Sequence, residues 1–178
     1  MMARWIRFRK DSGPQWPIDF DEACARLASA QRVCAPRQAS PILLWGEGEG
    51  EYPFALIVPL RLAPGRQQRW RAWGLAPAVA AYRQFGVPAY FDDALDGGDI
   101  WLHGRRISRS VAAVLGECVV LAASFLMQFP GKCVATPSRE LEQAFRLRLE
   151  AQHGWSFEFS WPSRREAEAI GAVALAAR

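Results

Sequence analysis

The spacing of apolar residues along the chain predicts an alternation of short strands and helices. In the first half, apolar runs and period-two alternation indicate strands, whereas apolar residues three or four positions apart indicate helices. The predicted elements are strands over 5–9, 41–45 and 54–60 and helices over 20–34 and 67–85. We expect a break in the second helix, because Pro77 suits the first turn of a helix, and we expect Gly86 to end it.

The second half has the pattern of an antiparallel meander followed by two helices. The strands and their intervening turns are predicted, in order, over 99–102, 103–104, 106–114, 116–117 and 118–125. A helix is then expected from Thr136 to about Gln152, with Gly154 as its stop. Ser163 and Glu166 have the spacing of a capping box that opens a last helix.

This order of elements predicts an α+β fold, in which helices pack on a mainly antiparallel (mixed) sheet. The 178 residues suit a single domain over 1–178, because no linker, repeat or low-complexity tract divides them. An apolar fraction of 51% excludes a disordered chain. No apolar run is long enough to span a bilayer and no signal peptide is apparent, so we expect a cytoplasmic protein that contacts no membrane.

The net charge is +4, and almost all of the basic residues are arginine. This charge permits an acidic partner without identifying one. Trp70 and Trp73 lie among Arg61, Arg66, Arg69 and Arg71, a mixture that can bind single-stranded nucleic acid by stacking. We favour a helix that buries its tryptophans and exposes its arginines, and we expect no nucleic-acid partner. The four cysteines form no CxxC pair, so neither a metal site nor a disulfide framework is expected.

The segment GGDIWLHGRRISRS, from Gly97 to Ser110, resembles a hairpin of the biotin/lipoate protein ligase family. In that hairpin an Asn-Asp pair opens a strand, and a Gly-Lys/Arg-Lys-Ile-x-Gly run follows the turn. Here Asp99 keeps the acid, whereas Arg106 occupies the lysine position and Arg109 the glycine position.

The resemblance implies the fold of the family's catalytic domain, and it supplies expectations about ligands and partners. Lipoate, octanoate or biotin, together with ATP, are the ligands that it implies. The implied partners are a lipoyl or biotinyl carrier domain or an acyl carrier protein. The candidate ligand-binding residues are Asp99, Gly104, Arg106, Ser108 and Arg109.

Two departures from the family pattern argue against ligase activity. Arg106 keeps a positive charge but not the shape of the family's lysine, and Arg109 fills a place where glycine leaves room for a ligand. The family's Arg-Arg-x-Ser/Thr-Gly-Gly-Gly stretch is replaced by GEGEGEYP, whose glutamates repel a phosphate. We therefore interpret the chain as a pseudoenzyme, a binding or partner protein in lipoate or biotin attachment.

An enzymatic alternative rests on Cys133. Octanoyltransferases of the same family pass the acyl group through a cysteine thioester, and their cysteine follows the last strand of the sheet. Cys133 occupies about that place, and Lys132 beside it would lower the pKa of the thiol. Such an acyltransferase needs no ATP and so tolerates the loss of a phosphate-binding loop. The sequence leaves both interpretations open, along with the acyl group and the oligomeric state.

Overall fold

The computed structural model of the chain describes residues 1–8, 20–31, 39–46, 50–91, 98–129, 132–133 and 138–170. The helices are α1 (Phe20–Gln31), α2 (Trp70–Gln84), α3 (Ser138–His153) and α4 (Arg164–Ala169), with 3-10 turns at Leu60–Leu62 and Gln67–Arg69. The main sheet is formed by β1 (Met2–Phe8), β2 (Ile42–Gly46), β3 (Glu51–Pro59), β7 (Val111–Leu115), β8 (Cys118–Leu126) and β11 (Ser156–Phe159). A three-stranded sheet contains β4 (Tyr90–Phe91), β5 (Ile100–Leu102) and β6 (Arg105–Ser108), and β9 (Gln128–Phe129) pairs with β10 (Lys132–Cys133).

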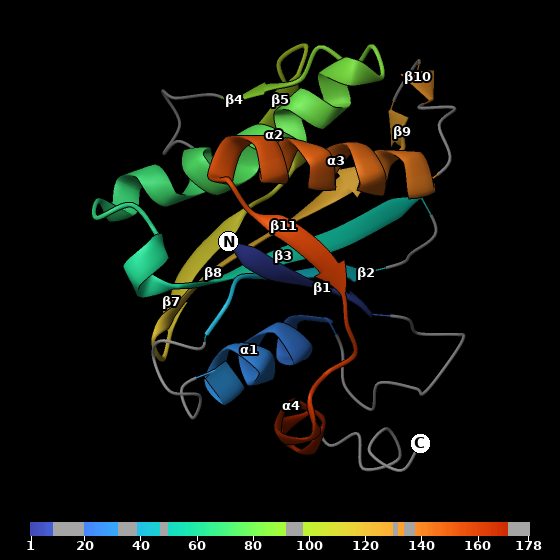
Figure 1. The fold of residues 1–178 in the computed structure, drawn as a ribbon. Helices are drawn as coiled ribbons and strands as arrows, with labels where there is room; N and C mark the ends of the chain where they lie inside the picture. The colour runs from blue at the N-terminus through green and yellow to red at the C-terminus, as the bar shows by residue number, and fades with distance from the viewer. Residues whose placement is uncertain are drawn as a thin grey trace.

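The main sheet is mixed and lies between two layers of helices. Its strand order is β11-β1-β2-β3-β8-β7, in which β1 runs parallel to both of its neighbours and the remaining pairs are antiparallel. Helices α2 and α3 cover one face, and α1 and α4 cover the other (Figure 1). The predicted α+β fold with a mixed, mainly antiparallel sheet is confirmed.

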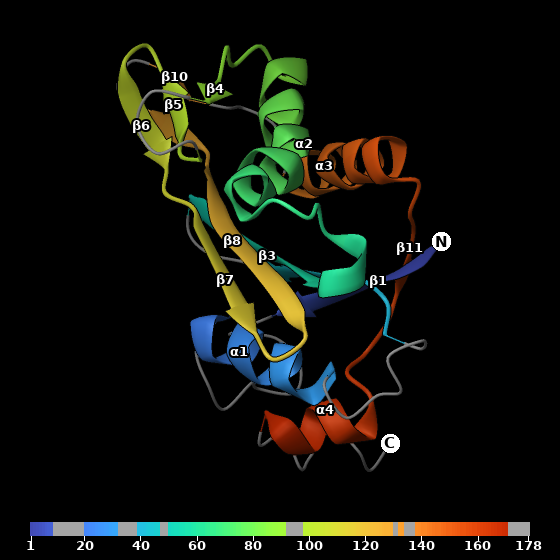
Figure 2. The ribbon, with the colours of Figure 1, turned by 90° about the vertical axis from the view of Figure 1, so that its left-hand side faces the viewer.

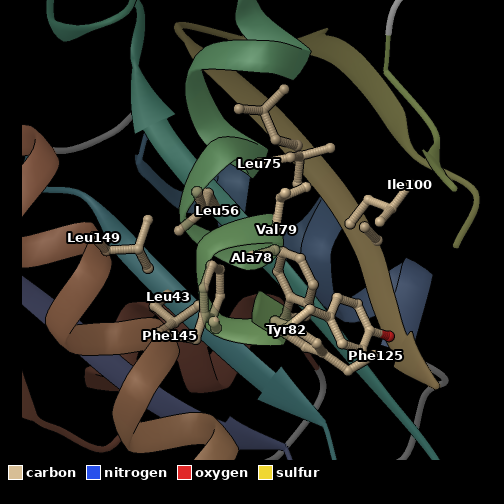
Figure 3. Close-up of a cluster of buried hydrophobic side chains, with 14 of the residues drawn as sticks. Leu43, Leu56, Leu75, Ala78, Val79, Tyr82, Ile100, Phe125, Phe145 and Leu149 are labelled. Atoms are coloured by element: carbon tan, nitrogen blue, oxygen red, sulfur yellow. The ribbon is translucent and has the colours of Figure 1, made fainter. Parts of the chain in front are cut away.

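Side chains that alternate along the central strands build a separate core on each face of the sheet. On β3, Phe54 and Leu56 point toward α2 and α3, whereas Ala55 and Ile57 point toward α1. Figure 3 shows the first core, where Phe145 of α3 and residues of α2 meet the sheet. From Phe54 to Pro59 both faces of β3 are therefore inaccessible to water, which explains why this part of the strand is continuously apolar.

Helix α2 corrects the prediction of a break at Pro77. The helix begins at Trp70 and runs without interruption through Pro77 to Gln84. Proline has no N–H, so the carbonyl oxygen of Trp73, one turn earlier, loses its partner within the helix. Gln152 of α3 replaces that partner, because its Nε2 donates to the Trp73 oxygen at 2.9 Å. A contact distant in sequence thus permits an internal proline, whereas the predicted stop at Gly86 is confirmed by its φ of 73°.

The strand predicted over 106–114 is divided in the structure. It breaks at Arg109 and Ser110, so that β6 pairs with β5 in the small sheet while β7 joins β8 in the main sheet. The two predicted turns are confirmed: both residues of the 103–104 turn have positive φ, and Gly116 has a φ of 63°. The small sheet lies over one end of β8 (Figure 2).

The predicted helices over 20–34 and 136–152 correspond to α1 and α3, although residues 32–34 and 136–137 lie outside the described part of the chain. The capping box of the last helix is confirmed in both directions, between Ser163 and Glu166. The strands β4, β9, β10 and β11 were not predicted.

The tryptophans at the start of α2 serve the interior, as the favoured interpretation predicts. Trp70 is 7% exposed and its indole nitrogen donates to the Pro64 carbonyl oxygen at 2.6 Å. Trp73 is half-buried and packs with its ring centroid 4.5 Å from that of His153. Burial lowers the pKa of His153 to about 4, so this side chain is neutral at physiological pH. Because Trp70 is buried, nucleic-acid bases cannot stack on its ring.

Among the described residues, no helix is long and apolar enough to cross a bilayer.

Candidate functional site

The hairpin formed by β5 and β6 carries most of the candidate residues. His103 and Gly104 both adopt positive φ angles, of 48° and 74°, which lets the chain reverse within two residues. Arg106, on β6, extends back toward the start of β5, where its Nη1 lies 3.2 Å from Oδ2 of Asp99. The sequence candidates Arg106 and Asp99 are therefore brought together.

Asp99 also organises the backbone at the base of the hairpin. Its Oδ1 accepts a hydrogen bond from the N–H of Ser110 at 2.8 Å, and the Ser110 hydroxyl donates to the Gly98 carbonyl oxygen at 2.5 Å. These bonds fix the kink that separates β6 from β7. Asp99 therefore has a structural role besides its ion pair. Ser110 was not a candidate residue, although its position next to the family's glycine position could have marked it as a turn residue.

The remaining hairpin candidates differ in how accessible they are. Ser108 is buried, and its hydroxyl oxygen accepts the Ser124 N–H of β8 at 3.2 Å, so it attaches the small sheet to the main one. The Gly104 N–H donates to the Tyr90 hydroxyl at 3.3 Å. Arg109 is exposed and forms no ion pair with any residue that the structure describes. The accessible charge of this hairpin is therefore carried by arginine.

A cluster of aromatic rings occupies the interior between the sheet and helices α2 and α3. The members of this aromatic cluster are Trp45, Tyr52, Phe54, Tyr82, Phe125 and Phe145. The Phe54 ring centroid lies 4.6 Å from that of Phe145 and 5.0 Å from that of Phe125. Figure 3 shows three of these rings, those of Tyr82, Phe125 and Phe145, between α2, α3 and the sheet. Close ring packing of this kind leaves no room for a ligand within the cluster.

Tyr82 brings a buried hydroxyl into this cluster, and the sequence did not single it out. Its hydroxyl donates to the Leu126 carbonyl oxygen at 3.1 Å and accepts the Leu126 N–H at 2.7 Å. Burial raises the pKa of this phenol above its ordinary value, so it stays neutral. A tyrosine among the apolar positions of a buried helix was the available signal, because a buried hydroxyl needs a partner.

For Cys133 and Lys132 the structure describes the position of the backbone only. They form β10, in which Cys133 is paired with Gln128 and Lys132 with Phe129, immediately beyond the end of β8. The N–H of Met127 donates to the Gly50 carbonyl oxygen at 2.9 Å, so this end of β8 adjoins the residue that precedes β3. Glu47 and Glu49 lie outside the described residues.

Within the described part of the chain, no three His, Cys, Asp or Glu side chains are grouped so that they could hold a metal ion. An open depression at the end of α2 is lined by Arg83, Gly86, Val87 and Pro88, none of which is a candidate from the sequence.

The architecture matches solved structures, although no family model and no curated protein matches the sequence. A bi-partite lipoate protein ligase of Thermoplasma acidophilum, reported with its E2 lipoyl domain, is 9% identical, with a TM-score of 0.72 over 96% of this chain and 91% of that one. Lipoate-protein ligase A bound with ATP is 10% identical, with a TM-score of 0.72 over 96% and 93%. A Helicobacter pylori biotin acetyl coenzyme A carboxylase synthetase is 12% identical, with a TM-score of 0.53 over 98% and 81%. This chain therefore has the fold of the biotin and lipoate ligase catalytic domains, as the hairpin resemblance predicts.

Proposed function

We propose that this chain is a ligase-like protein that does not activate acyl groups with ATP, and that it binds a lipoyl or biotinyl carrier domain. The observation that carries the proposal is the pairing of Arg106 with Asp99 on the accessible hairpin. In a ligase of this fold, the cation at this position would have to stabilise the charge that develops on a carboxylate and a phosphate. Here that cation is a guanidinium that contacts a protein carboxylate.

The geometry around Arg106 adds to this argument. A guanidinium is planar and larger than an ammonium, so its charge cannot be centred where that of lysine would be. Asp99 is itself held by the Ser110 N–H, which restricts how far the pair can move to admit an anion. An adenylating site depends on placement of the reacting groups to within about 1 Å. We infer that Arg106 is poorly placed for adenylation.

Support for a carrier-domain partner comes from the hairpin surface and from one related structure. Arg105, Arg106 and Arg109 are all exposed, and such a surface attracts acidic proteins. The ligase of Thermoplasma acidophilum is reported together with its E2 lipoyl domain. We propose that the hairpin of this chain contacts a domain of that class.

The test combines an activity assay with a binding assay. Incubation with ATP and lipoate, octanoate or biotin is expected to release no pyrophosphate and to leave the mass of an added carrier domain unchanged. The same carrier domain should bind with a Kd on the order of micromolar, and Arg105→Glu should weaken binding about tenfold at low salt. The control is Arg139→Glu, which reverses the charge of an exposed residue on α3, away from the hairpin. ATP-dependent acylation would refute the first half of the proposal, and equal binding by both variants would refute the second.

Cys133 supports a second candidate function, because its backbone pairs with that of Gln128, two residues beyond the end of β8, and the acyltransferase interpretation expects the nucleophile after this strand. In that reaction the Cys133 thiolate would attack the acyl thioester of a donor, forming a new C–S bond while the donor leaves as its thiol. Incubation with octanoyl-carrier protein would then add an octanoyl mass that hydroxylamine removes and that Cys133→Ser abolishes. An unchanged mass, with the fold intact by circular dichroism, would refute this candidate.

A further inference from the structure

Three aromatic side chains form a row at the edge of the main sheet that lies opposite β7. In the parallel register of β1 and β11, Trp5 is paired with Phe159, and Trp161 follows two residues later. The rings of Trp5 and Phe159 are in contact, as are those of Phe159 and Trp161, and we call these three residues the aromatic row. β11 is the last strand at this edge and lies in front of the other strands in Figure 1.

Two members of the aromatic row face solvent. Phe159 is 48% exposed and Trp161 is 57% exposed, the highest value of any large apolar side chain in the described part of the chain. Phe157, two residues earlier than Phe159 on β11, is buried and belongs to the core on the α2 and α3 face of the sheet. Neither Phe159 nor Trp161 belongs to the buried core of either face. Adjoining exposed rings of this kind are typical of an interaction surface.

The rings of the aromatic row meet edge to face. Successive ring centroids are 5.5 Å apart, and the ring planes make angles of 77° and 78°. The row therefore presents two corners, each formed by one ring face and the edge of the next ring, and not the flat platform on which a nucleobase stacks. Proline rings dock among aromatic side chains in domains that bind polyproline II helices. Two steps of 5.5 Å are also close to one turn of that helix, which is about 9 Å long.

The charge beside the aromatic row decides between a cationic and an acidic ligand. Aromatic rings that meet at an angle can also surround a quaternary ammonium group. Here the Arg146 guanidinium carbon already lies 4.5 Å from the Trp5 ring centroid, and Arg146 forms no ion pair with any residue that the structure describes. Glu142 is bonded to Arg7, and Glu150 accepts a backbone N–H of β11. This end of the row therefore repels a cation and attracts a carboxylate.

We propose that the aromatic row binds a proline-rich segment of a partner protein, with an acidic residue next to the prolines. A polyproline II helix has no internal hydrogen bonds, so an exposed indole such as that of Trp161 can donate its N–H to one of the free carbonyl oxygens. The helix is also ordered before it binds, which lowers the entropic cost of docking on a small surface. The acidic residue pairs with Arg146. This site is separate from the β5–β6 hairpin, which is attached to β8, and it does not depend on the function proposed above.

The test uses a synthetic peptide of six prolines with a glutamate at each end, so that either direction of binding places an acid at Arg146. Calorimetric titration of the 178-residue chain is expected to give a Kd on the order of 100 micromolar. The same peptide with lysine in place of both glutamates should bind about tenfold more weakly at low salt. A Gly-Ser peptide with the same glutamates is a flexible coil and should not bind.

Variants of the aromatic row and of Arg146 locate the binding site. Trp161→Ala should weaken binding of the glutamate peptide at least tenfold, because the indole supplies both a corner and the N–H donor. Arg146→Gln should make the glutamate and lysine peptides bind equally, a result that a purely structural role of Arg146 would not produce. Val111→Ala is the matched control, because Val111 is 53% exposed at the opposite edge of the sheet and its loss should leave binding unchanged. Circular dichroism checks that each variant is folded.

Nuclear magnetic resonance of the wild-type chain supplies an independent measurement. The indole N–H signal of Trp161 should shift when the glutamate peptide is added, whereas that of the buried Trp70 should not. Absence of both heat and shift at millimolar peptide would overturn the proposal, as would equal binding by wild type and Trp161→Ala. Equal binding of the glutamate and lysine peptides by wild type, or tighter binding of tetramethylammonium than of the glutamate peptide, would also overturn it.

Discussion

Replacing Phe125 with alanine is expected to lower the free energy of unfolding by about 3–5 kcal/mol, because truncating a buried phenylalanine leaves a cavity that the surroundings fill only in part. Phe125 is completely buried, with the rings of Phe54 and Tyr82 both 5.0 Å away between centroids. These neighbours are themselves held by other members of the aromatic cluster. The cluster therefore has little freedom to collapse into the vacated space.

Urea unfolding of Phe125→Ala, followed by fluorescence and circular dichroism, measures this loss. Phe159→Ala is the matched control, because Phe159 is 48% exposed and its truncation leaves no cavity. We expect the control to cost at most about 1 kcal/mol. A similar loss for the two variants would contradict the assignment of the aromatic cluster as the packed core. It would also reopen the question of whether a ligand occupies this part of the fold.

Replacing Arg4 with methionine is expected to cost about 3–5 kcal/mol, because the buried Glu166 carboxylate loses the guanidinium that balances its charge. The Glu166 side chain is 3% exposed and bonds to Arg4 at 2.6 and 2.8 Å. Arg4 also donates to Ser160 and to the Trp161 carbonyl oxygen, so it connects β1 to the chain that enters α4. Loss of Arg4 would therefore weaken both the ion pair and the attachment of α4.

The dependence on pH distinguishes this mechanism from a simple loss of packing. Burial favours the neutral form of Glu166, but the hydrogen bonds and charge of Arg4, assisted by Ser163, outweigh it and hold the pKa of this carboxyl below its ordinary value. The pair therefore stabilises the fold above the unfolded pKa of about 4.5, and this contribution is lost as the pH falls through the folded pKa. The difference between Arg4→Met and wild type should shrink over that range.

Chemical denaturation at several pH values measures this difference. Arg164→Met is the control, since Arg164 and Glu168 form an exposed pair one turn apart on α4. Its loss should change stability by about 0.5 kcal/mol or less at any pH. If Arg4→Met and Arg164→Met lowered the free energy of unfolding equally, this would contradict the conclusion that the Arg4–Glu166 pair connects β1 to α4.

Elements with local signals were predictable from the sequence, and those that depend on distant contacts were not. The Ser163–Glu166 capping box and the 103–104 turn each satisfy their own backbone groups, so a few residues suffice to identify them. Pro77 was misread because its tolerance depends on Gln152, far along the chain. The division between β6 and β7 likewise depends on bonds from Ser110 to Gly98 and Asp99.

The candidate site, like the fold, was predictable only where a local sequence motif identifies a residue. The hairpin motif located Asp99 and Arg106, and the fold places them in an ion pair. It did not indicate that Ser108 would be buried against β8, because that contact depends on how the small sheet rests on the main one. Nor did apolar spacing show that the aromatic rings of five separate elements would meet in one cluster. Tertiary packing, which no local pattern encodes, decides both.

The position of β1 in the main sheet determines the order in which this chain can fold. β1 lies between β2 and β11, and its partner residues on β11 are near the opposite end of the sequence. During synthesis one side of β1 must stay open until β11 has left the ribosome, so a nascent chain exposes an unpaired strand for most of its elongation. Pairing between such distant segments also slows folding in solution. A circular permutant that begins at β11, so that β11 and α4 precede β1 in the chain, should therefore refold faster than the native order.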